Sequence, residues 1–281
     1  MKCAWNAFLG ILPPKYRVNV DKLGRESLQE LRLRLNEKPE LVTSLGSRWL
    51  EDVPTAQDLA FVVNMASRYS PWAATTAAQG YLTALGGHRI GLCGAVVTDG
   101  NGVKGIREPT ALCLRVARDF EGIAKGISFT GNVLILGPPG SGKTTLLRDL
   151  IRQRSNRGCG SVAVVDERGE LFPMSRDGCC FFSGQRTDIL TGSTKPEGIE
   201  WVLRTMGPQC IAVDEITSEG DCRALLAAAW CGVTVFATAH ASCAADLRGS
   251  KKYRPLVECG VFDTVVTLRR DKSYIQERLM G

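Results

Sequence analysis

The chain has 281 residues, of which 44% are hydrophobic and 23% are charged, and its formal net charge is +6 at pH 7. This composition predicts a globular protein with enough apolar residues for two domains, and the scattered basic residues exclude a nucleic-acid-binding tail or a polybasic membrane anchor. The eleven cysteines are odd in number and lack C-x-x-C spacing, so they predict reduced residues of a cytoplasmic protein. With only two histidines, no zinc site is expected.

The first 125 residues predict a small α+β domain. Within residues 25–35, Leu31, Leu33 and Leu35 alternate with Arg32 and Arg34, which favours a strand over a short helix. Residues 55–69 and 75–85 have the apolar spacing of helices. Residues 95–106 contain two β-rich runs around the turn sequence DGNG and therefore predict a hairpin.

Residues 126–281 predict a second domain, in which strand and helix patterns alternate as in a parallel sheet covered on both faces. A glycine-containing stretch at residues 120–130 is the expected hinge before it. The longest apolar stretch, residues 224–241, divides into a helix and a strand, so no transmembrane segment is expected. Five strands are expected, at residues 132–136, 161–165, 210–213, 233–238 and 262–268.

A phosphate-binding loop follows the first of these strands. Residues 137–144 read GPPGSGKT and fit G-x-x-x-x-G-K-[ST] between an apolar strand and a helix. Backbone N–H groups of such a loop face a nucleotide's phosphates, Lys143 brings a positive charge to them, and Thr144 offers a hydroxyl to Mg²⁺. The candidate nucleotide-binding residues are Gly137, Pro138, Pro139, Gly140, Ser141, Gly142, Lys143, Thr144 and Thr145.

Two carboxylates follow the apolar run 210–213, at the strand edge where open parallel sheets bind ligands. We expect Asp214 to hold Mg²⁺ through water, together with Thr144, and Glu215 to orient and deprotonate the attacking water. A solvated acidic loop is the other interpretation of such a pair, and the phosphate-binding loop in the same domain argues against it.

Two further strand ends carry candidate catalytic side chains. Asp166 and Glu167 follow the strand at 161–165, where Glu167 would position water or mark a subunit contact. A helix N-cap is the alternative role for Asp166. His240 follows the strand at 233–238 and is a candidate γ-phosphate sensor, although a lone histidine after a buried strand is often structural.

Four segments together resemble the secretion ATPase superfamily, which drives type II and type IV secretion and pilus assembly. They correspond to its Walker A, Asp box, Walker B and His box motifs, and they lie at residues 137–144, 165–170, 203–215 and 238–241. Within that superfamily, the upstream segments 86–94 and 114–118 and the run 31–35 resemble the stage III sporulation protein AA family. This resemblance extends over residues 8–280.

The resemblance implies a RecA-like P-loop ATPase core preceded by a smaller α+β domain, with ATP and Mg²⁺ as its ligands. It further implies a homohexameric ring in the mother-cell cytoplasm of an endospore former, working with membrane-embedded channel proteins between mother cell and forespore. The chain departs from the superfamily because Asp214 stands where glycine is typical and because the Cys₄ zinc element is missing. Whether Glu215 or Glu167 is the principal base therefore stays open.

Ring ATPases commonly borrow an arginine from a neighbouring subunit to stabilise charge on the phosphoryl group being transferred. The segment His88-Arg89 and the arginines Arg115 and Arg118 are the candidates for such a role in this sequence. Ordinary ion pairing is the alternative for each of them.

Three other functions share parts of the pattern. A nucleic-acid-dependent RecA-like ATPase would bind DNA in a salt-sensitive way, but the sequence shows no basic and aromatic groove pattern. A non-hydrolysing ATP-binding switch or scaffold is disfavoured by the acidic pair at 214–215. A small-molecule kinase would transfer phosphate to a metabolite.

Guanine specificity is not expected, because no N-K-x-D segment is present. The sequence leaves open the cargo, the membrane partner and the ring size.

Overall fold

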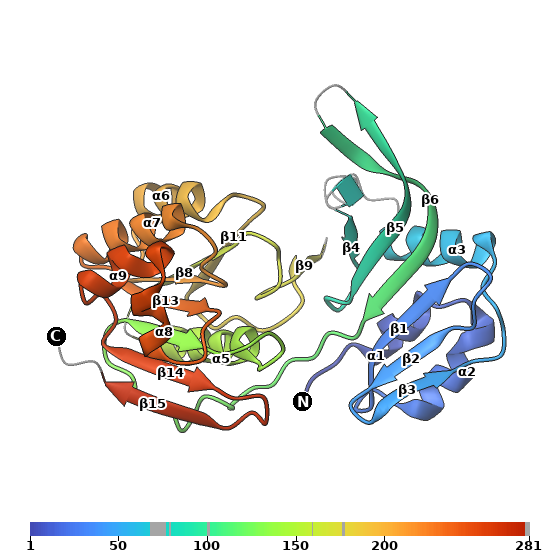
Figure 1. Ribbon diagram of the computed structural model, residues 1–281, viewed down its shortest axis with the longest axis horizontal. Helices are drawn as coiled ribbons and strands as arrows, with labels where there is room; N and C mark the ends of the chain where they lie inside the picture. The colour runs from blue at the N-terminus through green and yellow to red at the C-terminus, as the bar shows by residue number, and fades with distance from the viewer. Residues whose placement is uncertain (68–76, 79, 100–101, 159, 176–177, 279–281) are drawn as a thin grey trace. The chain divides into compact units, whose positions relative to one another are not determined.

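The computed structural model describes residues 1–67, 77–78, 80–99, 102–158, 160–175 and 178–278 (Figure 1). The chain forms two compact units. Unit 1 comprises Met1–Asp119 and Pro173–Phe181, and unit 2 comprises Phe120–Phe172 and Phe182–Gly281. The first break therefore falls at the start of the expected hinge, while the domain boundary after residue 125 stays a prediction.

Unit 1 is built on a six-stranded antiparallel sheet with strand order β3-β2-β1-β6-β5-β4. Three helices with described bounds accompany this sheet, and a separate two-stranded ribbon pairs β9 with β10. The strands are β1 (Leu28–Arg34), β2 (Glu40–Thr43), β3 (Gly46–Trp49), β4 (Tyr81–Thr83), β5 (Arg89–Asp99), β6 (Gly102–Arg115), β9 (Met174–Ser175) and β10 (Gly178–Cys179). The helices are α1 (Trp5–Gly10), α2 (Pro14–Leu23) and α3 (Ala56–Ser67).

The alternation at 25–35 forms strand β1, as predicted. Leu31 and Leu33 are fully buried in the core of unit 1, whereas the intervening Arg32 is partly exposed and forms an ion pair with Glu30. Helix α3 and the β5–β6 hairpin are also confirmed, and the hairpin is longer than expected. The alternation of leucine and arginine thus separates a buried face from a charged face of one strand.

The helix predicted at 75–85 is wrong over its last residues. Residues 77–78 are helical, residues 75, 76 and 79 lie outside the described part of the chain, and Tyr81–Thr83 form strand β4. Gly86 and Gly87 have φ values of +84° and +80°, so the chain reverses and β4 pairs with β5. This long-range pairing overrides the helical spacing of the local sequence.

Unit 2 contains a seven-stranded sheet with order β11-β8-β12-β13-β7-β14-β15, parallel except for the antiparallel β14–β15 pair. The five expected strands are present, and β11 and β15 are additional. The strands are β7 (Val133–Leu136), β8 (Val162–Asp166), β11 (Thr187–Thr191), β12 (Cys210–Val213), β13 (Thr234–Ala239), β14 (Thr264–Leu268) and β15 (Tyr274–Arg278). The helices are α5 (Lys143–Asn156), α6 (Lys195–Thr205), α7 (Glu219–Trp230), α8 (Ala244–Gly249), the 3₁₀ turn η1 (Lys251–Tyr253) and α9 (Arg254–Glu258).

Helices cover both faces of this sheet. One face packs against α6, α7, α8 and α9 in a single buried cluster that includes Val213, Leu225 and Ala237. Helix α5 contacts β7, β8, β11 and β13, and none of its buried residues belongs to that cluster, so it lies on the opposite face. The fold is therefore α/β, with an antiparallel first sheet and a parallel-rich second sheet. Within the described residues, no helix combines the length and the apolar character needed to cross a bilayer.

Candidate functional site

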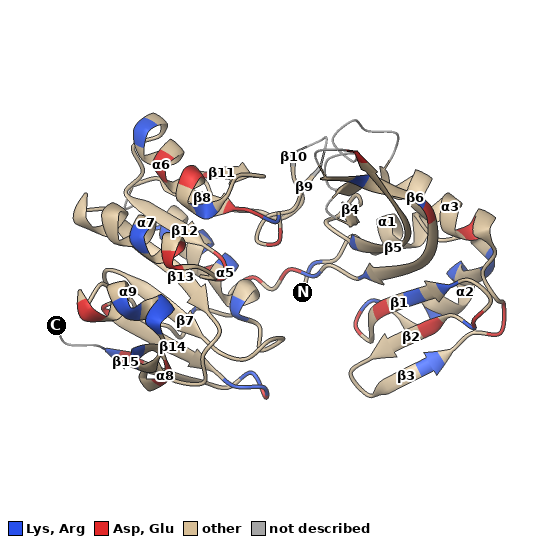
Figure 2. Cartoon of the chain, turned by 45° about the horizontal axis from the view of Figure 1, so that its top comes forward, with Lys and Arg blue, Asp and Glu red and all other residues tan. Residues whose placement is uncertain are grey.

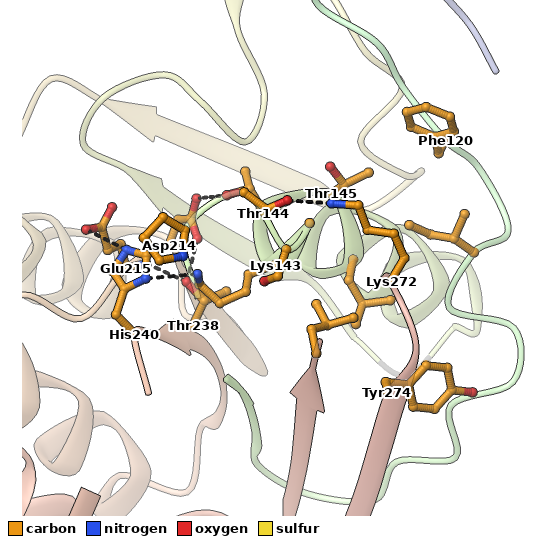
Figure 3. Close-up of a pocket in the computed structure, with 17 residues that line it drawn as sticks. Phe120, Lys143, Thr144, Thr145, Asp214, Glu215, Thr238, His240, Lys272 and Tyr274 are labelled. Carbon is orange, nitrogen blue, oxygen red and sulfur yellow. Dashed lines mark hydrogen bonds and ion pairs between the residues drawn. The ribbon is translucent and has the colours of Figure 1, made fainter. Parts of the chain in front are cut away.

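A pocket of about 710 Å³ lies in unit 2, at the edge where its parallel strands end. Its walls come from the loop after β7, the first turn of α5, the ends of β12 and β13, the β14–β15 hairpin and the segment before β7 (Figure 3). The structure thus brings the phosphate-binding loop together with Asp214, Glu215 and His240, as the strand order predicts.

The phosphate-binding loop depends on its glycines. Gly140 and Gly142 have φ values of +73° and +99°, in the left-handed region that favours glycine. A Cβ atom at Gly137 would lie 2.6 Å from Ser141 Oγ. Ser141 Oγ itself is buried and has no hydrogen-bond partner among the described residues. A tight glycine loop with an unsatisfied hydroxyl fits a phosphate ligand, which would supply the missing acceptor.

Lys143 begins α5 and is 7% exposed. Its ammonium has three hydrogens and three acceptors, namely Gly137 O at 2.8 Å, Pro138 O at 3.0 Å and His240 Nδ1 at 3.0 Å. Burial lowers the pKa of Lys143, although Asp214 and Glu215 act in the opposite direction. The lysine charge is therefore already inside the pocket, surrounded by groups that a phosphate can replace.

Asp214 forms the centre of a hydrogen-bonded chain that links the first turn of α5 to the ends of β12 and β13. Thr144 Oγ1 donates to Asp214 Oδ2 at 2.6 Å, and Thr238 Oγ1 donates to Asp214 Oδ1 at 2.6 Å. Burial raises the pKa of Asp214, while the two hydroxyls oppose the rise. A hydroxyl beside a carboxylate is the oxygen donor set that Mg²⁺ prefers, with water completing the shell. The described residues contain no cluster of three or more acidic, histidine or cysteine side chains that would suit another metal.

Glu215 contacts His240 and lies in the same pocket. His240 Nε2 is 3.2 Å from Glu215 Oε1, and Arg168 Nη1 is 3.8 Å from Glu215 Oε2. Because Lys143 can only donate, His240 Nδ1 accepts its hydrogen bond and Nε2 carries the hydrogen that points to Glu215. Glu215 has a φ of +53°, which is uncommon outside glycine and concentrates at functional sites.

Glu167 has a different environment from Glu215. Its Oε2 is 2.5 Å from Nζ of Lys195, whose side chain is 6% exposed, and Lys195 Nζ also lies 4.0 Å from Asp221 Oδ2. Glu167 is not among the residues that line the pocket. The structure therefore separates the two candidate bases: Glu215 faces the phosphate-binding loop and Glu167 pairs with a buried lysine.

Asp166 ends β8 and organises the turn that follows, with no helix beginning there, so the N-cap alternative is not realised. Its Oδ1 and Oδ2 accept hydrogen bonds from the N–H groups of Glu170 and Phe172, each at 2.9 Å. Burial raises the pKa of Asp166 from its ordinary 3.8 to about 6, although these two hydrogen bonds oppose the rise.

This raised pKa predicts a specific pH dependence of stability. Since the folded state binds the Asp166 proton more tightly, its contribution to the free energy of unfolding falls as pH rises from 3.8 through about 6. The loss is about 3 kcal/mol, at about 1.36 kcal/mol for each pH unit. Denaturant unfolding of wild type and Asp166→Asn at pH values from 4 to about 7 measures it, because the free energy of unfolding of wild type, relative to that of Asp166→Asn, should fall by most of that amount. A difference that is constant with pH would contradict the assignment.

A family model described as "Sporulation stage III, protein AA" matches residues 13–277. The chain belongs to this family. The Bacillus subtilis (strain 168) protein named Stage III sporulation protein AA is 34% identical over 282 residues, covering 95% of this chain and 92% of that protein. The Arabidopsis thaliana protein SEEDLING PLASTID DEVELOPMENT 1 is 28% identical over 243 residues, covering 84% of this chain and 33% of its own length.

Two solved structures share the fold of this chain. The pilus retraction motor PilT with bound ADP superimposes with a TM-score of 0.62 at 16% identity, covering 89% of this chain and 76% of PilT. The Legionella pneumophila ATPase DotB gives a TM-score of 0.60 at 15% identity, covering 94% of this chain and 79% of DotB. The chain therefore has the fold of the secretion ATPases, as the resemblance implied.

The unit 1 residues suggested for phosphoryl-charge stabilisation all have local partners. His88 is fully buried, with Nε2 3.0 Å from Ala4 O, and burial lowers its pKa to about 4. Arg89 stacks on the Tyr81 ring, Arg115 Nε is 3.1 Å from Glu30 Oε1, and Arg118 Nε donates to Arg25 O. An arginine finger among them stays a prediction.

The sequence alone did not indicate a role for several residues of the pocket. Thr238 lies within the His box segment, yet only the fold shows its hydroxyl between Asp214 and the Glu215 N–H, which donates to it at 2.8 Å. Lys272 Nζ, from the β14–β15 hairpin, donates to Gly140 O (Figure 3). Phe120 and Tyr274 line the pocket from segments that no motif marks.

Proposed function

We propose that this protein hydrolyses ATP to ADP and phosphate and that it works as a homohexameric ring in the cytoplasm. We further propose that it energises a membrane-embedded channel between mother cell and forespore. The observation that carries the proposal is the convergence, in one pocket, of the phosphate-binding loop, the Thr144–Asp214 pair and the Glu215–His240 pair. Family membership supports the sporulation role, and the shared fold with secretion ATPases supports the ring.

The proposed binding step uses the loop at 137–145. Its backbone N–H groups hold the phosphates, and Lys143 exchanges the two carbonyls and His240 Nδ1 for phosphate oxygens. Thr144 and Asp214 would hold Mg²⁺, the latter through water, and the metal supplies positive charge that stabilises the phosphate oxygens. His240 would respond to the γ-phosphate, and its contacts with both Lys143 and Glu215 support this role.

In the proposed chemical step, Glu215 accepts a proton from the attacking water. The water oxygen bonds to the γ-phosphorus while the bond from that phosphorus to the β–γ bridging oxygen breaks, and ADP leaves with the electron pair. Glu167 is the alternative base, but its pairing with Lys195 favours a positioning role for that part of the turn.

A phosphate-release assay tests this function against its rivals. Hydrolysis of ATP by wild type that requires Mg²⁺ and is unchanged by single-stranded DNA is the expected result. Stimulation by DNA would favour a nucleic-acid-dependent ATPase, and nucleotide binding without phosphate release would favour a switch or scaffold.

In the view of Figure 2, Lys and Arg residues are interspersed with Asp and Glu residues in each unit, which does not favour a nucleic-acid partner.

The proposed metal role of Asp214 gives a quantitative expectation. Asp214→Asn should raise the Mg²⁺ concentration that gives half-maximal hydrolysis by about 10–100-fold, because substitution of an outer-shell residue typically weakens metal binding by that factor. A Mg²⁺ titration of the steady-state rate measures this shift. Asp263→Asn is the control, because Asp263 accepts a hydrogen bond from the Asn132 N–H and does not line the pocket. An unchanged Mg²⁺ requirement in Asp214→Asn would remove this residue from the metal site.

A further inference from the structure

The pocket has a second end that the phosphate chemistry does not use. Figure 3 shows Phe120 and Tyr274 on the side of the phosphate-binding loop opposite to Glu215 and His240. Ile123, three residues after Phe120 in the chain, also lines the pocket, and Phe120, Ile123 and Tyr274 are between 37% and 43% exposed. An apolar wall of this kind next to a phosphate site is suited to a flat aromatic ring.

One side of this wall is held by a buried carboxylate on α5. Asp149 is 1% exposed, and its Oδ1 and Oδ2 accept hydrogen bonds from the N–H groups of Gly122 and Ala124, each at 2.9 Å. Arg152 Nη1 donates to Asp149 Oδ1 at 2.7 Å. Burial would raise the pKa of Asp149, but the N–H donors of Ala124 and Gly122, the Gln153 side chain and the charge of Arg152 together outweigh it, so the pKa lies below its ordinary value. An ionised side chain therefore fixes the backbone on both sides of Ile123.

The same segment is held from the other side by β15. Gln276 Nε2 donates to Ser128 O, and a Cβ atom at Gly126 would come within 2.9 Å of the Tyr274 hydroxyl. The stretch from Phe120 onward thus runs between helix α5, which begins at the phosphate-binding loop, and the edge strand that carries Tyr274.

We propose that residues 120–124 form a platform for the base of the bound nucleotide and that Asp149 is the positioning residue that holds this platform. The inference rests on the proposed nucleotide binding and adds the subsite for the base. With the phosphates on the loop at 137–145, the ribose and base extend to the end of the pocket lined by Phe120, Ile123 and Tyr274. In this proposal Asp149 does not contact the nucleotide. It acts through the backbone of Gly122 and Ala124, which donate hydrogen bonds to its carboxylate.

The test compares a ligand that has a base with one that lacks it. Calorimetric titration with ADP and with inorganic pyrophosphate, both with Mg²⁺, gives two dissociation constants for each variant. Asp149→Asn keeps the size of the side chain but has one acceptor oxygen in place of two. It should raise the ADP dissociation constant about 10-fold, which corresponds to the loss of one charge-assisted hydrogen bond, while the pyrophosphate constant stays within about 2-fold.

Two further variants distinguish a specific effect on the base site from a general loss of folding. Ile123→Ala shortens an exposed side chain and should weaken ADP alone by a similar factor, and the double variant should show less than the sum of the two effects. Asp58→Asn is the matched control: this unit 1 carboxylate also accepts a backbone N–H, from Thr55 at 2.7 Å, and pairs with Lys15. It should change neither constant.

Three results would overturn the platform. Equal weakening of ADP and pyrophosphate by Asp149→Asn would mean that Asp149 acts on α5 and the phosphate-binding loop. Unchanged ADP affinity in Ile123→Ala would remove the apolar wall from the base site. Lys143→Ala should weaken both ligands, and a wild-type protein that binds neither would contradict the proposed nucleotide function itself, along with this inference.

Discussion

Replacing Glu215 by glutamine is expected to slow ATP hydrolysis by about 10²–10⁴-fold, the usual contribution of a general base, while ATP binding is retained. The amide keeps the size of the side chain and can still accept the hydrogen bond from His240 Nε2 at the position of Oε1. It cannot take a proton from water. Single-turnover hydrolysis and nucleotide titration of the same preparation separate the two effects.

Glu167→Gln is the matched control for that substitution, because it makes the same chemical change at the other candidate base. It removes the charge that faces the buried Lys195, so we expect some loss of stability, but only a small effect on the chemical step. If Glu167→Gln abolished hydrolysis and Glu215→Gln did not, the assignment of the base would be reversed.

Lys143→Ala is expected to weaken ADP binding by about 10–100-fold, since a hydrogen bond to a charged group contributes about 1.5–3 kcal/mol and each 1.4 kcal/mol is a factor of ten. Hydrolysis should fall below detection, because the same ammonium stabilises charge on the phosphates during transfer. Calorimetry with ADP and phosphate release with ATP measure the two losses.

Lys104→Ala controls for the removal of a lysine as such. Lys104 lies in unit 1, is 62% exposed on its side chain and pairs with Asp99 at 2.9 Å. Its loss should leave both nucleotide affinity and rate unchanged, as exposed ion pairs contribute little. Full nucleotide affinity in Lys143→Ala would show that the loop at 137–144 is not the phosphate site.

The parallel core of unit 2 could be predicted from the sequence because its central strands are buried on both faces and are uniformly apolar. β7 and β12, for example, consist only of buried residues. β15 was missed for the opposite reason: it is a polar edge strand that is mostly exposed and is defined by its pairing with β14. Because Lys272 and Tyr274 come from this hairpin, one end of the pocket could not be predicted.

The acids show a second limit of sequence reasoning. Glu167 and Glu215 both follow an apolar strand, so the local sequence does not show which of them is the base. What separates them is Lys195, a buried partner for Glu167 that lies 28 residues further along the chain. A contact of that kind depends on how α6 packs against β8, and no periodicity in the sequence encodes it.

The ATPase rate per subunit, measured over a series of protein concentrations, shows whether this protein is a ring ATPase with this pocket as its active site. We expect a rate that rises steeply with concentration as rings assemble and that is absent from Lys143→Ala at every concentration. A rate that stays near zero throughout the wild-type series, or that persists in Lys143→Ala, would contradict this expectation.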